Sequence, residues 1–335
     1  MSTTALDIGT YTIKAISGKG GKRPVIAKTA ETFNTAGIDI PKDDSQAEKI
    51  TELINNFFTD HKLAKTDVRL SLPENVVSTK IISMPTLSDA ELASAIEWQA
   101  EQHIPIPKED LSLEYQVLFR PTRKDQGVPM RVLLVGVRKD VIERFTNIFF
   151  QLGIEATVLE TQILSLIRSL GFEKTDPTTL VAHLGASNLN LALVHQGELD
   201  FVFTNSSGGQ LLTKALEKTI GLDMQQAEEY KRTYGLIEEH FQGKVRNALL
   251  PTVNIFTNEM QKAIRFFINQ SPQEAVKRIV LSGGTSQLPG LIEYISQTLG
   301  IEVLLASPFA VASGEIPQAN HQAMTICMGL LIKEM

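Results

Sequence analysis

Two short segments in different halves of the sequence carry glycine and small polar residues in the same order. Leu6–Ile13 reads LDIGTYTI and Ala182–Leu189 reads AHLGASNL, so Gly9 aligns with Gly185. Each segment predicts two strands joined by a tight turn. Glycine there lets backbone N–H groups approach a phosphate, because no Cβ holds the ligand away. A single hairpin of this kind is more often an ordinary turn, whereas the duplication favours a phosphate site built from both.

Two further segments carry groups suited to a nucleoside. In the helix predicted around 227–232, Glu228 and Lys231 are three residues apart and share a face. A carboxylate there could accept hydrogen bonds from ribose hydroxyls while Lys231 lies beside the base. Taken alone, this spacing favours an ordinary ion pair on a solvated helix. The segment Ser282–Thr285 (SGGT) follows a predicted strand and precedes a helix expected to start at Pro289, which would expose bare backbone to a nucleotide.

The elements that must position these segments alternate between strands and helices around glycine turns, which indicates an α/β protein. A helix is expected at about 45–61, where Ser45 and Glu48 form a capping box. A helix–strand–strand–helix pattern over 82–155 then indicates a small inserted α+β domain, whose first helix opens with a second capping box at Ser88–Glu91.

The chain after 180 repeats the opening hairpin and continues with helices and strands. Helices are expected at about 208–220, 223–234 and 244–270, followed by the strands RIVLS and IEVLL and a final helix from about 320.

Composition narrows the class of protein. The chain has 335 residues, too many for one compact core, and a net charge of -6, which argues against a nucleic-acid partner. Its one cysteine, Cys327, excludes an internal disulfide and lies in an apolar run. The opening MSTTALDIGT lacks a secretory signal, and no stretch approaches the ~18 apolar residues that span a bilayer. We therefore expect a cytoplasmic protein. No Ser–His–Asp set, zinc signature or Walker loop offers a competing catalytic site.

In order and spacing, the four segments resemble the phosphate and adenosine motifs of the actin, sugar-kinase and heat-shock-chaperone ATPase superfamily. The inserted run SDAELASAIEWQAEQHIPIPKEDLSLEYQVL, with GLDMQQAEEYKRTYG and IVLSGGTSQLPGLIEYISQTLGIEV, is similar to PilM-type proteins of type IV pilus assembly. FtsA, a cell-division relative, usually ends in an amphipathic membrane helix. Here the chain stops at Met335 directly after the last domain helix, which favours PilM.

The resemblance implies a two-lobed, actin-like fold built from duplicated ribonuclease-H-like halves with an FtsA-type insertion. Lobe 1 would comprise 1–81, 156–178 and 312–335, with the insertion at 82–155. Lobe 2 would comprise 179–311, including a helical part at about 236–276.

The resemblance also assigns a site for ATP or ADP with Mg²⁺. Asp7 would face the metal-bound phosphates, and Glu160 would lie near an attacking water, although a helix-start carboxylate explains Glu160 equally well. The other nucleotide-binding residues implied are Gly9, Thr10 and Tyr11; Gly185, Ser187 and Asn188; Glu228, Lys231 and Arg232; and Gly283, Gly284 and Thr285.

The second hairpin departs from the family pattern. Relatives begin it with Asp and place another Asp five to seven residues later, where this chain has His183 and Asn190. Because Mg²⁺ prefers anionic oxygen ligands, we expect weak or absent hydrolysis with retained nucleotide binding. His183 would either contact phosphate when protonated or be a core histidine bonded to backbone, and the second is favoured.

The resemblance implies a scaffold of pilus biogenesis. PilM-like proteins bind the N-terminal cytoplasmic tail of the inner-membrane protein PilN, in a groove between the first lobe and the inserted domain. Such a partner would hold the protein at the inner membrane. Contacts with pilus motor or platform proteins and self-association are also compatible with it. The alternatives are an FtsA-like filament-forming protein and a small-molecule kinase of the same superfamily.

Overall fold

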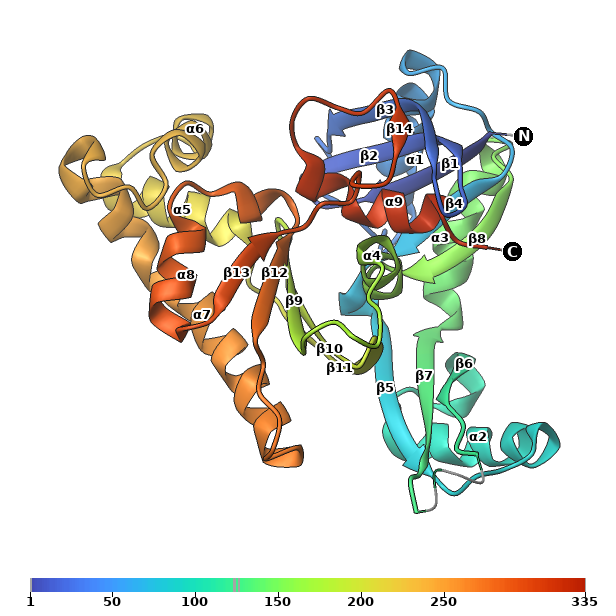
Figure 1. Ribbon diagram of the computed structural model, residues 1–335. Helices are drawn as coiled ribbons and strands as arrows, with labels where there is room; N and C mark the ends of the chain where they lie inside the picture. Colours follow the sequence, from blue (N-terminus) through green and yellow to red (C-terminus); the bar gives the residue numbers. More distant parts are fainter. Residues whose placement is uncertain (1, 123–124, 126, 335) are drawn as a thin grey trace.

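The computed structural model describes residues 2–122, 125 and 127–334, so Met1 and Met335 lie outside it. Two lobes and an inserted domain make up the molecule, with each lobe built on its own sheet (Figure 1). This arrangement confirms the α/β class and the two-lobed form that the sequence predicts.

A six-stranded sheet in the order β14-β3-β2-β1-β4-β8 forms the core of lobe 1. The strands are β1 (Thr3–Ile8), β2 (Thr12–Lys19), β3 (Val25–Phe33), β4 (Val68–Leu72), β8 (Ala156–Thr161) and β14 (Ser313–Gly314). The helices around it are α1 (Asp44–Asp60), α3 (Lys139–Gln151), α4 (Gln162–Leu170) and α9 (Thr325–Leu331). Alternate residues of a strand face opposite sides of a sheet. Leu6 and Ile8 accordingly pack in the cluster of α1 and α3, whereas Ala5 packs in the cluster of α9.

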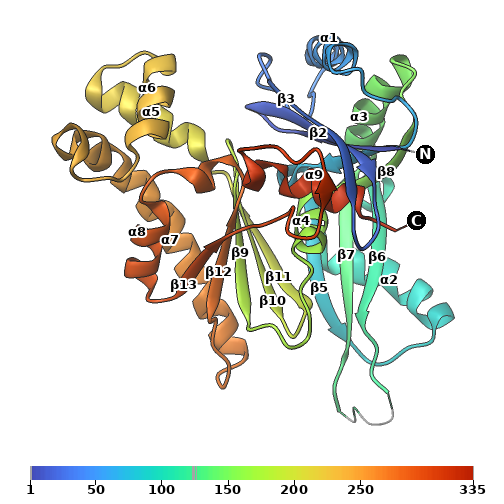
Figure 2. The same ribbon diagram turned by 45° about the horizontal axis from the view of Figure 1, so that its top comes forward.

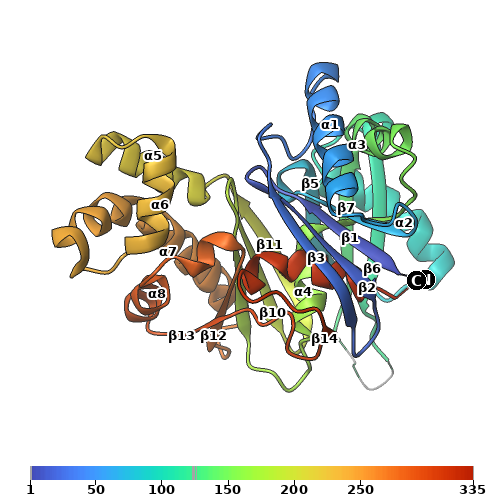
Figure 3. The same ribbon diagram turned by 90° about the horizontal axis from the view of Figure 1, so that it is seen from above.

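Lobe 2 repeats this plan with a five-stranded sheet in the order β11-β10-β9-β12-β13 (Figure 2). The strands are β9 (Thr179–Leu184), β10 (Leu189–His195), β11 (Glu198–Asn205), β12 (Arg278–Ser282) and β13 (Glu302–Leu305). The helices are α5 (Gly209–Ile220), α6 (Met224–Tyr234), α7 (Lys244–Gln270) and α8 (Leu291–Leu299). Leu180 and Ala182 of β9 face these helices, whereas Val181 between them faces α4. Both large sheets are therefore buried on two faces, and α4 and α9 lie between them (Figure 3).

The insertion consists of an antiparallel sheet, β5-β7-β6, covered by one helix. Its elements are β5 (Val77–Met84), α2 (Asp89–His103), β6 (Leu111–Phe119) and β7 (Met130–Arg138). Leu92, Ile96 and Ala100 of α2 are buried against this sheet. The sequence pattern places α3 with the insertion at 82–155, but Phe145 and Phe149 of α3 pack in the core of lobe 1. The apolar face of α3 is complementary to α1, which sequence periodicity alone does not reveal.

The insertion also contacts lobe 2. Leu133 of β7 shares an apolar cluster with Leu166 of α4 and with Val181 and Ala192 of lobe 2. On the same strand, the Arg131 guanidinium donates to the Leu199 carbonyl oxygen at 3.0 Å and to an Asp200 carboxylate oxygen at 2.8 Å. The insertion is therefore attached to both lobes.

A buried glutamate connects the root of the insertion to α4. Glu74 lies in the 3-10 turn Glu74–Val76 between β4 and β5, and its carboxylate oxygen accepts the N–H of Ile163 at 2.8 Å. Burial raises the pKa of Glu74 to about 7, although the Ile163 N–H partly opposes this shift.

Several local predictions can be compared with the structure. The capping box of Ser88 and Glu91 is confirmed. That of Ser45 and Glu48 is wrong, because Asp43 caps α1 and accepts the Gln46 N–H instead. The helix expected to start at Pro289 begins at Leu291, and the one expected from about 320 is a 3-10 turn (His321–Met324) followed by α9.

Two other predictions concern the membrane and the thiol. No helix within the described residues is both long enough and apolar enough to cross a bilayer. Cys327 is fully buried, and its thiol donates to the Lys14 carbonyl oxygen.

Candidate functional site

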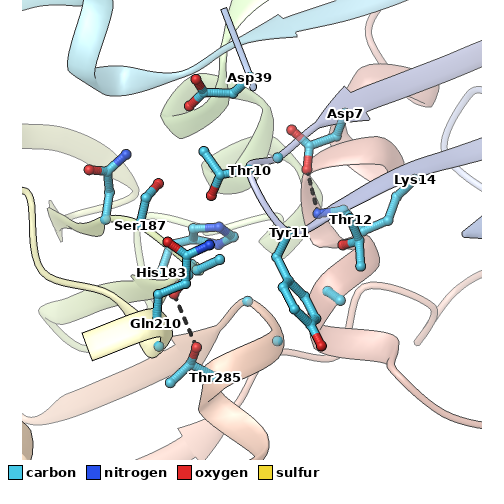
Figure 4. Close-up of a pocket in the computed structure, with 18 of the residues that line it drawn as sticks. Asp7, Thr10, Tyr11, Thr12, Lys14, Asp39, His183, Ser187, Gln210 and Thr285 are labelled. Carbon is cyan, nitrogen blue, oxygen red and sulfur yellow. Dashed lines mark hydrogen bonds and ion pairs between the residues drawn. The ribbon is translucent and has the colours of Figure 1, made fainter. Parts of the chain in front are cut away.

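A pocket between the lobes brings together residues from all four predicted segments (Figure 4). The residues that the sequence predicts and that line it are Asp7, Gly9, Thr10 and Tyr11; Gly185, Ser187 and Asn188; Glu228, Lys231 and Arg232; and Gly283, Gly284 and Thr285. Segments far apart in the chain therefore meet at one place.

The two glycine hairpins have the same turn geometry. The Gly9 N–H donates to the Thr12 carbonyl oxygen at 3.0 Å, and the Gly185 N–H donates to the Asn188 carbonyl oxygen at 2.9 Å. A Cβ on either glycine would lie 3.1 or 3.2 Å from that same carbonyl oxygen, closer than ordinary van der Waals contact. Glycine is thus favoured by the turn itself, and the equivalence of the two segments is structural as well as sequential.

The start of α5 supports the second hairpin, and the sequence analysis did not single it out. The N–H groups of Gly209 and Gln210 donate to the carbonyl oxygens of Gly185 and Ala186, each at 2.9 Å. The Thr285 hydroxyl donates to the same Gly185 oxygen at 3.0 Å. Thr285 therefore positions the hairpin. The run SSGG before α5, a double glycine at a helix start, was the signal that could have revealed this contact.

Asp7 is buried in a network that includes Lys14, a residue that the sequence analysis missed. The Lys14 ammonium lies 2.7 Å from one Asp7 oxygen, while Ser71 and Gln162 donate to the other at 2.7 and 2.8 Å. Burial raises the pKa of Asp7, but the Lys14 charge and these hydrogen bonds outweigh it and lower the pKa below its ordinary value. Asp7 is therefore ionised and already paired with a cation.

His183 occupies the position in the second hairpin that corresponds to Asp7. Its Nδ1 lies 3.2 Å from the Ser282 hydroxyl oxygen, and burial lowers its pKa to about 4. Burial therefore favours the neutral ring near pH 7, which disfavours a protonated histidine as a phosphate contact there. It is a buried, hydrogen-bonded histidine as favoured from the sequence, but its partner is a side chain instead of the backbone.

The α6 charges form a buried cluster instead of a solvated pair. Glu228 accepts hydrogen bonds from Lys231, from Arg232 and from the Thr213 hydroxyl. Burial raises the pKa of Glu228, but the Lys231 charge together with these hydrogen bonds outweighs it, so the pKa is lowered. Because Glu228 and Lys231 engage each other inside the pocket wall, their free donors and acceptors are few.

One contact crosses the pocket from lobe to lobe. The Arg232 guanidinium of lobe 2 lies 5.6 Å from the ring centroid of Tyr11 in lobe 1, within cation–π range. The cavity measures about 240 Å³, below the ~300–1,000 Å³ typical of ligand pockets. Arg232 and Tyr11 therefore join the two lobes across a small cavity.

Comparison with known proteins identifies the family. The family model described as type IV pilus assembly protein PilM matches residues 5–331. The chain belongs to this family.

Relatives of known structure support the fold. A chain from a PilM–PilN type IV pilus biogenesis complex superposes with a TM-score of 0.85 at 22% identity, covering 99% of both chains. MreB5 of Spiroplasma citri bound to AMPPNP superposes with a TM-score of 0.57 at 13% identity, covering 98% of this chain and 94% of that one. The cell division protein FtsA of Streptococcus pneumoniae is 24% identical over 91% of this chain and 75% of its own length.

Glu160 is satisfied by neighbouring side chains. It is not among the pocket residues, and its carboxylate accepts hydrogen bonds from Arg168, Lys333 and Ser165. Glu160 thus holds α4 and Lys333 against β8, which fits its interpretation as a satisfied carboxylate at a helix start, while a place near an attacking water stays a prediction. Gln162, two residues later, lines the pocket instead.

The groups that line the pocket are chemically compatible with a nucleotide, the ligand that the resemblance implies. Among the described residues, Thr10 Oγ1 and Asn190 Oδ1 are buried without a hydrogen-bond partner, and both residues line the pocket. A Cβ at Gly284 would meet nothing within 4 Å, so this backbone is open. Phosphates would lie against the hairpin turns and Lys14, with the nucleoside near Glu228 and Gly284.

The pocket offers fewer candidate ligands for a metal ion than contacts for a nucleotide. No group of three His, Cys, Asp or Glu residues in the described chain could hold a metal ion. Mg²⁺ often uses only one or two carboxylates together with phosphate oxygens and water, so this finding is compatible with a metal that arrives with the nucleotide.

Proposed function

We propose that this PilM-family chain is a nucleotide-binding scaffold of type IV pilus assembly, which binds the N-terminal cytoplasmic tail of a PilN-like inner-membrane protein. Such a tail would recruit the chain to the cytoplasmic face of the inner membrane. Support comes from the likeness to a chain of the PilM–PilN complex over 99% of both lengths.

The observation that carries the proposal is a groove between α3 and the edge strand β8. Phe150 of α3 lines it, together with Ile154, Glu155 and Ala156 at the start of β8. Because β8 ends the lobe 1 sheet, its outer edge is available to pair with an extended peptide. Because α3 and β8 both belong to lobe 1, this groove lies beside the insertion and not, as the resemblance implies, between it and lobe 1.

The chemistry of the groove favours a basic and apolar peptide. Phe150 is 83% exposed, an unusual state for a large apolar side chain on a helix that faces a groove. Three carboxylates line the groove, from Asp140, Glu143 and Glu155, against one guanidinium, from Arg144. A peptide with an apolar anchor and a positive charge would complement both features.

Peptide titration tests this half of the proposal. A labelled peptide with the N-terminal sequence of the PilN-like protein is titrated with the full chain and followed by fluorescence polarisation. Phe150→Ala should weaken binding at least about tenfold, the effect of losing a central apolar anchor. Phe203→Ala, which alters an exposed phenylalanine of lobe 2, is the matched control and should change little. Equal affinities for both variants would place the peptide elsewhere, and no binding would reject the partner.

The nucleotide half predicts binding with weak or absent hydrolysis. The second hairpin offers a neutral histidine and an amide where carboxylates would hold the metal, and Asp7 is engaged by Lys14. ATP should therefore bind in equilibrium dialysis while phosphate release stays at background. Mg²⁺-dependent turnover that Asp7→Asn abolishes would contradict this expectation.

A filament-forming role is the second candidate, because the chain aligns with the FtsA of Streptococcus pneumoniae over 91% of its length. Nucleotide-dependent pelleting without peptide binding would favour it over the scaffold.

A further inference from the structure

The loop after β3 is fixed onto the first phosphate hairpin by one buried side chain. The Asn34 amide donates to the Gly9 carbonyl oxygen at 2.8 Å and to the Ile38 carbonyl oxygen at 2.7 Å. Its own N–H donates to the Tyr11 carbonyl oxygen at 2.8 Å. Asn34 is 6% exposed, so these bonds are sheltered from water. The residue that follows Ile38 is therefore held in a defined position beside the hairpin.

That residue is Asp39, which lines the pocket and points into it above Thr10 (Figure 4). One Asp39 oxygen accepts the N–H of Ile40 at 2.8 Å. Among the described residues, no Lys or Arg forms an ion pair with Asp39. Asp7 and Glu228, which line the same pocket, are each paired with a lysine. Burial raises the pKa of Asp39 and the nearby Asp7 charge adds to this rise, while the backbone N–H groups and the Lys42 charge partly oppose it.

A second observation also points to a missing ligand. Asn190 is 2% exposed and lines the same pocket, yet its Oδ1 has no partner among the described residues. Buried oxygens of this kind are nearly always satisfied, by protein, water or a ligand. An unpaired carboxylate and an unsatisfied amide oxygen are two hard oxygen donors, the type that Mg²⁺ prefers.

Charge balance supports the same conclusion. Four carboxylates line the pocket, from Asp7, Glu31, Asp39 and Glu228, against three cations, from Lys14, Lys231 and Arg232. His183 adds no charge near pH 7, since its pKa is about 4. A nucleotide polyphosphate entering this pocket therefore needs an additional cation.

We propose that Asp39 is the carboxylate that holds the divalent cation of a bound nucleotide, with Asn190 Oδ1 as a neutral oxygen donor. Asp39 would replace the carboxylates that the second hairpin lacks, while Asp7 remains paired with Lys14. Asn34 is the positioning residue, because it ties the Asp39 loop to the hairpin. The proposal rests on the nucleotide binding proposed above.

The test compares the affinity of a fluorescent ATP analogue in Mg²⁺ and in EDTA. In the wild type, Mg²⁺ should tighten binding. In Asp39→Asn this gain should fall about tenfold or more, which corresponds to about 1.4 kcal/mol. In EDTA the same variant should bind the analogue as tightly as the wild type or more tightly, because a repelling charge is gone. Asp60→Asn removes an exposed carboxylate from α1 and is the charge-matched control.

A metal-rescue variant separates ligation from a merely structural role. Asp39→Cys should lose the Mg²⁺ gain but regain a cation-dependent gain in Cd²⁺, because thiolates select soft metals. The native Cys327 is fully buried and should not contribute. A misplaced loop would be rescued by neither cation, which would overturn the proposal.

The remaining outcomes are also decisive. An unchanged Mg²⁺ gain in Asp39→Asn overturns the role of Asp39, as does wild-type binding that is equal with and without Mg²⁺, and in both cases nucleotide binding stands. Wild-type protein that binds no analogue in either buffer refutes the nucleotide half of the proposed function and this inference with it. None of these results would count for or against the proposed peptide binding.

Discussion

Glu74 allows a sharp test of the packing at the root of the insertion. It is 3% exposed, accepts the Ile163 N–H at the start of α4, and has a pKa that burial raises from an ordinary 4.5 to about 7. Replacing it with Gln keeps the accepting oxygen and removes the ionisation. The variant therefore isolates the free energy of burying the charge.

The sign and size of the effect follow from proton linkage. The unfolded chain releases the Glu74 proton near pH 4.5, whereas the native state keeps it until about pH 7. The free energy of unfolding therefore falls as pH rises through this window and levels off above it. The difference between the two pKa values corresponds to about 3 kcal/mol. Glu74→Gln does not ionise, so its free energy of unfolding should not fall in this way. The difference between the variant and the wild type should therefore grow by about 3 kcal/mol in favour of the variant from about pH 4.5 to about pH 8.

Urea unfolding followed by circular dichroism at a series of pH values measures this difference. Glu52→Gln, at an exposed glutamate on α1, is the control and should stay within about 0.5 kcal/mol of the wild type. A difference between Glu74→Gln and the wild type that does not change with pH would show that Glu74 has the same pKa in the native and unfolded states. The proposed cost of burial would then be refuted.

Three further predictions concern packing and the pocket. A Cβ at Gly329 of α9 would lie 1.7 Å from the Ser165 carbonyl oxygen of α4, so Gly329→Ala should destabilise the chain by roughly 2 kcal/mol or more and lower its thermal midpoint; an unchanged midpoint would contradict it. Lys14→Ala leaves Asp7 buried without its cation and should cost ~3–5 kcal/mol in urea unfolding. The double variant Asp7→Leu/Lys14→Met should recover most of that loss, and no recovery would argue against a paired charge. Tyr11→Ala removes the contact with Arg232, worth ~0.5–1 kcal/mol, and should speed nucleotide release about two- to fivefold in stopped-flow measurements. Tyr11→Phe keeps the ring and should release nucleotide at the wild-type rate; equal rates in all three proteins would show that the contact does not gate release.

Local patterns in the sequence predicted the parts of the site that are local in structure. Gly9 and Gly185 could be recognised because each turn closes within four residues, Gly9 on Thr12 and Gly185 on Asn188. Lys14 was within reach as well. Its pairing with Asp7 across β1 and β2 depends on strand register, and the length of the hairpin sets that register.

Other features depended on contacts between distant parts of the chain. Asn34 acts on Gly9, 25 residues away, and Lys333 reaches Glu160 across 173 residues. No spacing rule connects such pairs, so Asp39 was missed and the two interpretations of Glu160 could not be distinguished. The error at α1 has a different cause. Asp43, Asp44 and Ser45 are all good helix caps, and the choice among them depends on the direction from which the chain enters the helix.

The attachment of the insertion to lobe 2 through Arg131 and the cluster around Leu133 has a mechanical consequence. Two bodies joined only at a hinge can swing apart freely, but here a third body touches both. Any rotation that widens the cleft must slide or break the contact between β7 and β11. A ligand that shifts the insertion would then change the free energy of opening the cleft. By reciprocity, a ligand bound in the cleft would change the affinity of the insertion's ligand by the same factor. This coupling can be measured in two equivalent ways. One compares the peptide affinity with and without nucleotide, and the other compares the nucleotide affinity with and without peptide.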